Sequence, residues 1–235
     1  MRWPGRVLWG LGEAAVTFGV LVLLLVVHQL WWSNVTGHAA ARHAVAALER
    51  HWDAVAPKTS EQSATARSGA VRGRAPATAA DASSSGPDGY AVIRIPRIGV
   101  TAPIAEGVSK ARVLNHGFVG HYPGTAQPGE LGNFALAGHR NTHGEPFRYI
   151  NRLRIGDTVS VETATARYTY VVIATVPRTS ADDGTVIAPV PYSSVHPADR
   201  LTGPGHYLTL TTCTPEYTSL YRLVVWGRLR SVAPR

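Results

Sequence analysis

Apolar and polar residues are distributed differently in three parts of the chain. Residues 14–32, AAVTFGVLVLLLVVHQLWW, contain no Asp, Glu, Lys or Arg. At about 1.5 Å of rise per residue, a helix over this segment spans roughly 28 Å, which matches one bilayer core. Residues 57–89 contain a single valine and otherwise no large apolar side chain. From residue 90 onward, short alternating segments separated by Gly and Pro predict β-strands.

The first segment is predicted to be an uncleaved membrane anchor. Arg2 and Arg6 precede it, and Trp31 and Trp32 lie where an interfacial aromatic belt forms. A cleaved signal peptide is the alternative, because it shares the basic start and the apolar run. The anchor is favoured because the apolar run is long and the small residues 39–41 lie well beyond its end. An anchor with its N-terminus inside places the rest of the chain outside the cell.

Two segments connect the anchor to the strand-rich part. Residues 38–55 are rich in Ala, with apolar spacing at Val45, Leu48 and Trp52 that predicts a short helix. Residues 57–89 cannot bury a core and are predicted to be a flexible tether with a root-mean-square span of about 30 Å. The predicted organisation is a cytoplasmic N-terminus (1–13), a transmembrane anchor (14–32), a juxtamembrane helix (33–56), a flexible linker (57–89) and a globular domain (90–231).

The globular domain is predicted to be all-β. Its strand signals are YAVIRI, the run around GVTAPIA, NFALAGH, DTVSVET, ARYTYVVIATVP, HYLTLTTC and YRLVVWGRL. Loops rich in Gly and Pro separate these signals, and the helical hints, near 109–115 and 146–153, are short. Many short strands in about 140 residues predict a compact β-barrel or sandwich.

Composition narrows the chemistry. Cys213 is the only cysteine, which excludes a disulfide scaffold and a cysteine-based zinc site. The formal charge of +8 comes almost entirely from Arg, and no basic run has interleaved aromatics, so no nucleic-acid partner is expected. His139 and His143 have the spacing of a zinc pair, but Arg140 replaces the Glu of that motif and Gly144 indicates a loop. The acidic residues are dispersed, so neither a metal nor another cofactor is expected.

Cys213 lies at the end of the alternating strand HYLTLTTC. Alternation places the two leucines and Thr212 on one face, which is predicted to be buried, and Cys213 on the opposite face. Pro215 lacks an N–H donor and ends the strand ladder just past the thiol. The next strand is predicted to return antiparallel after residues 214–220, which brings Arg222 close to Cys213. Outside the cell an unpaired thiol is a liability unless it has a function.

A cysteine nucleophile needs a neighbouring base or cation, because only the thiolate attacks. The chain has ten histidines. His139 stands out because it closes the strand signal NFALAGHR, where it can meet another strand end in space. The alternative is that His139 is a solvated or capping residue, as most histidines are.

These residues together resemble the sortase family. T-L-T-T-C at 209–213 is similar to the TLxTC signature of sortases, and His139 and Arg222 fit the His and Arg of that family in the same order. GHYPGTAQPGELGNFALAGHR and TTCTPEYTSLYRLVVWGRL look most like the class E sortases of actinobacteria. The resemblance covers about residues 90–230. It implies an all-β fold, an eight-stranded sortase β-barrel with short helices, preceded by one N-terminal transmembrane helix and a flexible linker.

The resemblance implies a membrane-bound cysteine transpeptidase with its catalytic domain at 90–231. Such enzymes cut a sorting signal (LPXTG in general, LAXTG for class E) between Thr and Gly. They then pass the acyl group to an amine of a peptidoglycan precursor. The expected partners are therefore secreted proteins with such a C-terminal signal, together with this amine. The expected location is the plasma membrane, single-pass, with the catalytic domain on the outer face, as in a Gram-positive actinobacterium.

The same resemblance assigns roles to five residues. It implies that Cys213 attacks the Thr carbonyl and forms a thioester. His139 protonates the departing Gly amine and then deprotonates the incoming amine, while Arg222 holds the oxyanion. Thr212 and Tyr122 are expected to contact the substrate by resemblance only. Thr212 is predicted to point inward, and a packing aromatic is the alternative for Tyr122.

Three other functions remain open from the sequence. A pilin-polymerising sortase uses a lysine of another protein as the acceptor, and a plain cysteine peptidase uses water. A tethered β-barrel binding module, in which Cys213 is incidental, is the third. The effect of an added amine separates the peptidase from the transferases, and Cys213→Ala leaves only the binding module intact.

Overall fold

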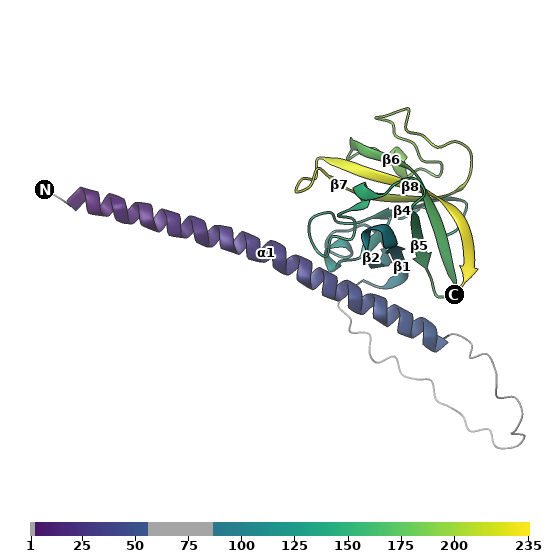
Figure 1. Cartoon of the computed structure of the whole chain (residues 1–235), viewed down its shortest axis with the longest axis horizontal. Helices are drawn as coiled ribbons and strands as arrows, with labels where there is room; N and C mark the ends of the chain where they lie inside the picture. The colour runs from purple at the N-terminus through teal and green to yellow at the C-terminus, as the bar shows by residue number, and fades with distance from the viewer. Residues whose placement is uncertain (1–2, 56–86) are drawn as a thin grey trace, which may run out of the picture.

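The structure is a computed structural model that describes residues 3–55 and 87–235. It consists of one long helix and a β-barrel that packs beside the C-terminal part of this helix (Figure 1). The predicted flexible linker, 57–89, lies almost entirely outside the described residues.

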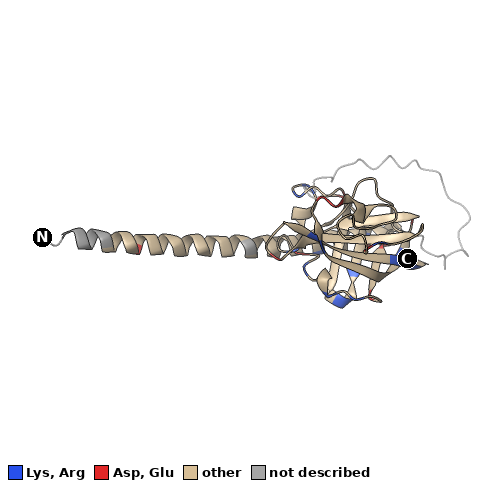
Figure 2. Ribbon diagram, turned by 90° about the horizontal axis from the view of Figure 1, so that it is seen from above, with Lys and Arg blue, Asp and Glu red and all other residues tan. Residues whose placement is uncertain are grey.

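The helix α1 (Trp3–Val55) contains both the predicted anchor and the predicted juxtamembrane helix in one continuous element. The coloured part of its N-terminal half is almost entirely uncharged, whereas several basic and acidic positions lie on the barrel (Figure 2). Val16, Phe18 and the apolar side chains at 20–27 are all exposed. The helix is long and apolar enough to cross a membrane, judged by length and composition. Residues 14–55 contain no proline that would interrupt the helix, so the two predicted segments form one continuous helix.

Eight strands close into a barrel in the order β1-β2-β3-β4-β7-β8-β6-β5. The strands are β1 (Gly89–Ile95), β2 (Val100–Glu106), β3 (Val119–His121), β4 (Gly132–Ala137), β5 (Thr158–Glu162), β6 (Ala166–Ser180), β7 (His206–Thr214) and β8 (Tyr221–Pro234). The pairs β2–β3 and β4–β7 are parallel, and the other six are antiparallel. Short 3₁₀ helices lie between strands: η1 (Pro96–Ile98), η2 (Leu114–His116), η3 (Ile150–Arg152) and η4 (Gly184–Ile187). The expected eight-stranded barrel with short helices is confirmed.

Side chains on both faces of β7 and β8 are buried. Leu208 and Leu210 face the barrel interior and belong to the main core, as alternation predicts. On the other face, Trp226 packs with Val186 of η4 in a second cluster. The long loop between β6 and β7 therefore covers the outer face of this sheet. The face opposite the leucines becomes accessible only toward the strand end, where Cys213 is half-buried.

The C-terminal part of α1 is held against the barrel by apolar contacts. Val45, Trp52 and Leu48, the apolar positions of the predicted short helix, cluster with Val92 of β1. Ion pairs from Glu49 to Arg94 and from Asp53 to Arg235 flank this cluster. These contacts hold the barrel against α1 directly, so the linker alone does not set its position.

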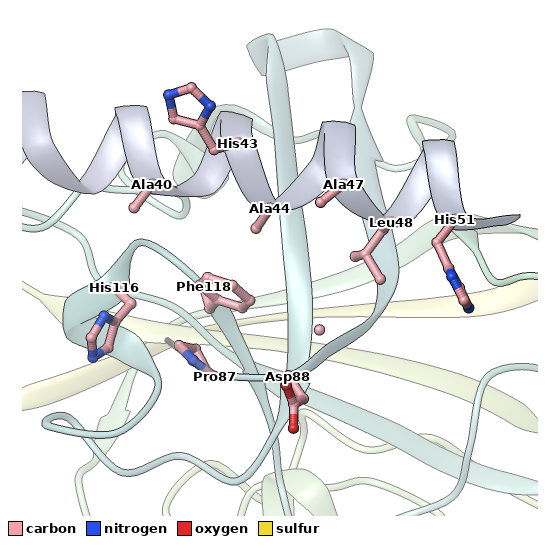
Figure 3. A pocket seen from close by; sticks show the side chains of 11 residues that line it. Ala40, His43, Ala44, Ala47, Leu48, His51, Pro87, Asp88, His116 and Phe118 are labelled. Atoms are coloured by element: carbon pink, nitrogen blue, oxygen red, sulfur yellow. The ribbon is translucent and has the colours of Figure 1, made fainter. Parts of the chain in front are cut away.

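Near Gly37 the helix backbone approaches the barrel very closely. A Cβ at Gly37 would lie 2.4 Å from the backbone carbon of His143 and 2.7 Å from the nitrogen of Gly144, so only glycine fits here. Between this contact and Leu48, a cavity of about 460 Å³ separates the alanine-rich face of the helix from Phe118 (Figure 3). The cavity is lined by residues of α1, of 87–89 and of 116–118, and does not include Cys213.

Candidate active site

The β7–β8 hairpin places Cys213 beside Arg222. The two strands are antiparallel, and these two residues are directly paired in the register. β7 ends at Thr214, one residue before Pro215, and β8 begins at Tyr221, as the sequence predicts. The Arg222 guanidinium donates hydrogen bonds from Nη1 to the carbonyls of Ser219 and Tyr221, each at 3.0 Å. The connecting loop thus orients this guanidinium next to the strand end.

The third strand of the site, β4, carries His139 just past its end. β4 runs parallel to β7, with Ala137 paired to Thr211, and the Gly138 N–H donates to the Thr211 carbonyl at 3.1 Å. His139 follows directly after this last backbone bond, and Cys213 lies two residues beyond Thr211 on the neighbouring strand. Three neighbouring strands therefore bring His139, Cys213 and Arg222 to one end of the barrel, although they lie far apart in the sequence.

The His139 ring is held by two polar neighbours. Its Nε2 lies 2.8 Å from Oδ1 of Asn115, which follows Leu114 in η2. Because an amide oxygen can only accept, this bond requires a proton on Nε2. The ring also stacks on His143, with 5.3 Å between the ring centroids. Burial is the largest cause that lowers the pKa of His139, and together with the nearby His143 and Lys110 it brings this pKa to about 4. At neutral pH the imidazole is therefore uncharged.

Thr212 and Tyr122 lie on opposite faces of β7. The Thr212 side chain is buried on the face of the leucines, and its hydroxyl donates to the Gly138 carbonyl at 2.7 Å. The Tyr122 hydroxyl lies 3.0 Å from Oγ1 of Thr211, on the face that carries Cys213. Tyr122 is half-buried and lies beside the face that carries the thiol. The Thr212 hydroxyl instead binds the backbone of Gly138, the residue before His139.

Comparison with known proteins identifies the family. The family model described as the sortase domain matches residues 93–230. The chain belongs to the sortase family.

Two curated relatives of this sortase carry class E names. It is 44% identical to sortase SrtE1 of Streptomyces coelicolor over 230 residues, which are 96% of this chain and 58% of that protein. Sortase SrtE2 of the same organism is 34% identical over 237 residues, covering 97% of this chain and 85% of that protein. The chain thus spans 58% of the length of SrtE1.

The fold of this sortase agrees with solved structures. The crystal structure of sortase E1 from Streptomyces coelicolor with a tripeptide in the active site has a TM-score of 0.58 and 50% identity. The match covers 63% of this chain and 91% of that chain. The predicted resemblance to class E sortases is confirmed.

Two residues of the sortase site were not selected from the sequence. Asn115 contacts His139, yet an Asn near a turn is too common to stand out. The Arg140 guanidinium donates from Nη1 to the Cys213 carbonyl at 3.2 Å and to Oγ1 of Thr214 at 2.8 Å. The sequence pattern distinguishes Arg140 only as the residue that replaces the Glu of a zinc motif. Its contact with the cysteine strand depends on the parallel pairing of β4 and β7, which no local pattern indicates.

The β6–β7 loop of this sortase is organised around one buried carboxylate. Asp183 accepts hydrogen bonds from the hydroxyls of Thr179, Thr185, Ser193 and Ser194 at 2.5 to 2.8 Å. Burial raises the pKa of Asp183, but these hydroxyl bonds outweigh it and hold the pKa well below its usual range. An ionised residue therefore holds the β6–β7 loop in place over the outer face of β7 and β8.

Proposed function

We propose that this sortase is a membrane-anchored cysteine transpeptidase. It cleaves a LAXTG- or LPXTG-like sorting signal between Thr and Gly and transfers the acyl part to a peptidoglycan amine. The observation that carries the proposal is the arrangement of three neighbouring strands, which pairs Cys213 with Arg222 and ends β4, just before His139, beside the same end of β7. The tripeptide in the active site of the related Streptomyces coelicolor sortase E1 supports a peptide substrate.

In the acylation step the Cys213 thiolate attacks the Thr carbonyl carbon and forms a tetrahedral oxyanion. The Arg222 guanidinium, oriented by its bonds to the β7–β8 loop, stabilises this charge. Collapse breaks the Thr–Gly C–N bond, and the imidazolium of His139 gives its proton to the departing Gly amine. The products are a Thr thioester on Cys213, neutral His139 and a free glycine amine.

The low pKa of His139 determines how much of its imidazole is protonated before acylation. With a pKa of about 4, about one His139 in a thousand is protonated at pH 7, against about one in four for an ordinary histidine. The productive form, thiolate with imidazolium, is therefore a minority species. Its imidazolium is a strong acid, which favours proton transfer to the leaving amine.

In the second step the thioester is transferred to an amine. A thioester retains most of the acyl energy, so a bound amine can attack the carbonyl while neutral His139 accepts the amine proton. Cys213 then leaves as the thiolate and the new amide bond is complete. If water attacks the same intermediate, the product is a free acid, and the enzyme acts as a plain peptidase.

The proposed location is the outer face of the plasma membrane, with α1 as a single-pass anchor and its N-terminus inside. Residues 33–55 continue the helix beyond the predicted span by about 35 Å at 1.5 Å per residue. Because the barrel packs against Val45 and Trp52 on this extension, the site is held near the membrane surface. This arrangement suits a protein substrate and a lipid-linked amine that both reside at the membrane.

The test is mass spectrometry of the full chain in detergent micelles. LAXTG and LPXTG peptides are each added with and without triglycine, beside the Cys213→Ala variant. We expect a peptide–triglycine ligation product and a thioester mass on Cys213, both absent in the variant. Hydrolysis that triglycine does not divert would indicate a peptidase. A folded protein that neither cleaves nor binds covalently to either peptide would contradict the proposal and favour the binding module.

A further inference from the structure

The backbone ladder between β4 and β7 stops just before the two residues that the reaction needs. β4 ends at Ala137. The last backbone hydrogen bond from this side to β7 runs from the Gly138 N–H to the Thr211 carbonyl. In a regular parallel ladder, the next β7 carbonyl to accept a hydrogen bond from this side is that of Cys213. Its donor would be the backbone N–H two residues after Gly138, that of Arg140. Here the chain turns away after Gly138, and β7 continues alone to Thr214. Among the described residues, the backbone of Cys213 therefore has no hydrogen-bond partner on its β4 side.

Two side chains bridge the gap that this divergence leaves. The Thr212 hydroxyl donates to the Gly138 carbonyl at 2.7 Å. The Arg140 guanidinium donates to the Cys213 carbonyl, in the place of the missing backbone N–H, and to the Thr214 hydroxyl. Because Arg140 directly follows His139, one side chain connects the backbone of the histidine to the backbone of the cysteine.

The environment of Arg140 does not fit a residue kept only for stability. It is 7% exposed, and its Nε finds no hydrogen-bond partner among the described residues. The carboxylate nearest to it, that of Glu216, lies 3.8 Å from Nη2 and its side chain is 37% exposed. A buried guanidinium with a distant carboxylate and an unsatisfied donor costs free energy. A functional requirement accounts for keeping it at this position.

We propose that Arg140 is a positioning residue for Cys213. It fixes the free end of β7 so that the thiol stays aligned with His139 on one side and Arg222 on the other. This inference rests on the proposed transpeptidase function, because alignment has a kinetic consequence only if the thiol reacts. Arg140 contacts the backbone of Cys213 and touches no reacting atom, which distinguishes its role from that of Arg222.

Arg140→Gln is the variant that tests this role. It removes the Nη1 donor that bonds to both Cys213 and Thr214 but keeps a shorter amide donor, so the buried site stays polar. We expect kcat for ligation to fall about 10- to 100-fold, because small misplacements of a reacting group have effects of this size. KM for the peptide should change less than about threefold, because Arg140 is buried and binds the strand end rather than a surface open to substrate. Arg140→Lys should recover part of kcat, since it keeps a charged donor but not the planar guanidinium.

Arg228→Gln is the matched control. Arg228 donates to the Tyr207 hydroxyl at 3.2 Å, near the opposite end of β7, so its loss should leave kcat and KM unchanged. All variants are compared as full chains in detergent micelles, with circular dichroism and thermal melts to establish folding. A drop in melting temperature with unchanged kcat would overturn the proposal and assign Arg140 a structural role. If Arg140→Gln does not fold, the same comparison is made with Arg140→Lys. A lower kcat then supports the positioning role, and an unchanged kcat overturns it.

A second readout is independent of the transpeptidase reaction. Alkylation of Cys213 by iodoacetamide at pH 7 is followed by mass spectrometry in the wild type and the same variants. We expect alkylation to slow about 3- to 10-fold in Arg140→Gln, because the released strand end moves the thiol out of line with His139 and Arg222. If the wild type ligates no peptide, the proposed function fails, but this comparison still tests Arg140. Equal alkylation rates in wild type and variant would overturn the inference.

Discussion

Replacing His143 by Gln removes a ring that stacks on His139 and lowers its pKa. Burial is the largest cause of the low pKa of His139, about 4, and it persists in the variant. The contribution of His143 is lost, so the pKa of His139 should rise but stay below the ordinary value of about 6.5. The protonated population at pH 7, about one in a thousand in the wild type, increases accordingly.

The assay is NMR titration of histidine labelled with carbon-13 in the ring, with the full chain in detergent micelles. His139→Gln identifies the resonance among the ten histidines. In parallel, kcat/KM for acylation is measured against pH. Because acylation uses the imidazolium of His139, its rate at pH 7 should rise in His143→Gln. A wild-type His139 that titrates near 6.5 would refute the reasoning, as would a variant in which the pKa falls.

The same pKa predicts a pH dependence of stability. Between about pH 4 and 6.5 the unfolded chain binds a proton at His139 that the folded chain does not. The contribution of His139 to stability is therefore lost as the pH falls through this window and is retained above it. Thermal melts at pH 7 and 4.5 should show a larger decrease for the wild type than for His139→Gln. Equal decreases would contradict the low pKa.

Three further predictions address the oxyanion, the β6–β7 loop and the helix contact. Arg222→Ala should lower kcat about 10²- to 10³-fold, as loss of an oxyanion donor does; a loss under tenfold in ligation assays would contradict this role. Asp183→Ala should cost about 2 to 4 kcal/mol in urea unfolding, because buried hydroxyls lose their acceptor; an unchanged midpoint would contradict it. Gly37→Ala places a Cβ 2.4 Å from the His143 backbone, so α1 must move and trypsin should cleave it faster. Gly19→Ala, with open space around it, is the control, and equal cleavage would contradict the contact.

The strand pattern and the hairpin could be predicted because both depend on local signals. Alternation placed Leu208 and Leu210 in the core, and Pro215 marked the end of β7. A short connection between antiparallel strands then determined the pairing of Cys213 with Arg222. The strand β3 was not predicted, because its three residues, Val119–His121, are too few to show alternation.

The partners of the site residues could not be predicted, because they come from other segments. Asn115 reaches His139 through η2, and His143 stacks on it from the loop after β4. Arg140 reaches the Cys213 carbonyl only because β4 and β7 are parallel neighbours that diverge at this end. None of these contacts follows from spacing along the chain.

The sequence by itself determined the elements and the reactive groups: an apolar helix, a set of alternating strands, one thiol, and a histidine and an arginine at strand ends. These follow from periodicity and from the chemistry of single side chains, which are local properties. The tertiary structure decided which strands are neighbours, how the barrel rests on α1, and which groups surround His139. Those features depend on burial and on contacts between distant segments, and these are the factors that lower the pKa of His139 to about 4.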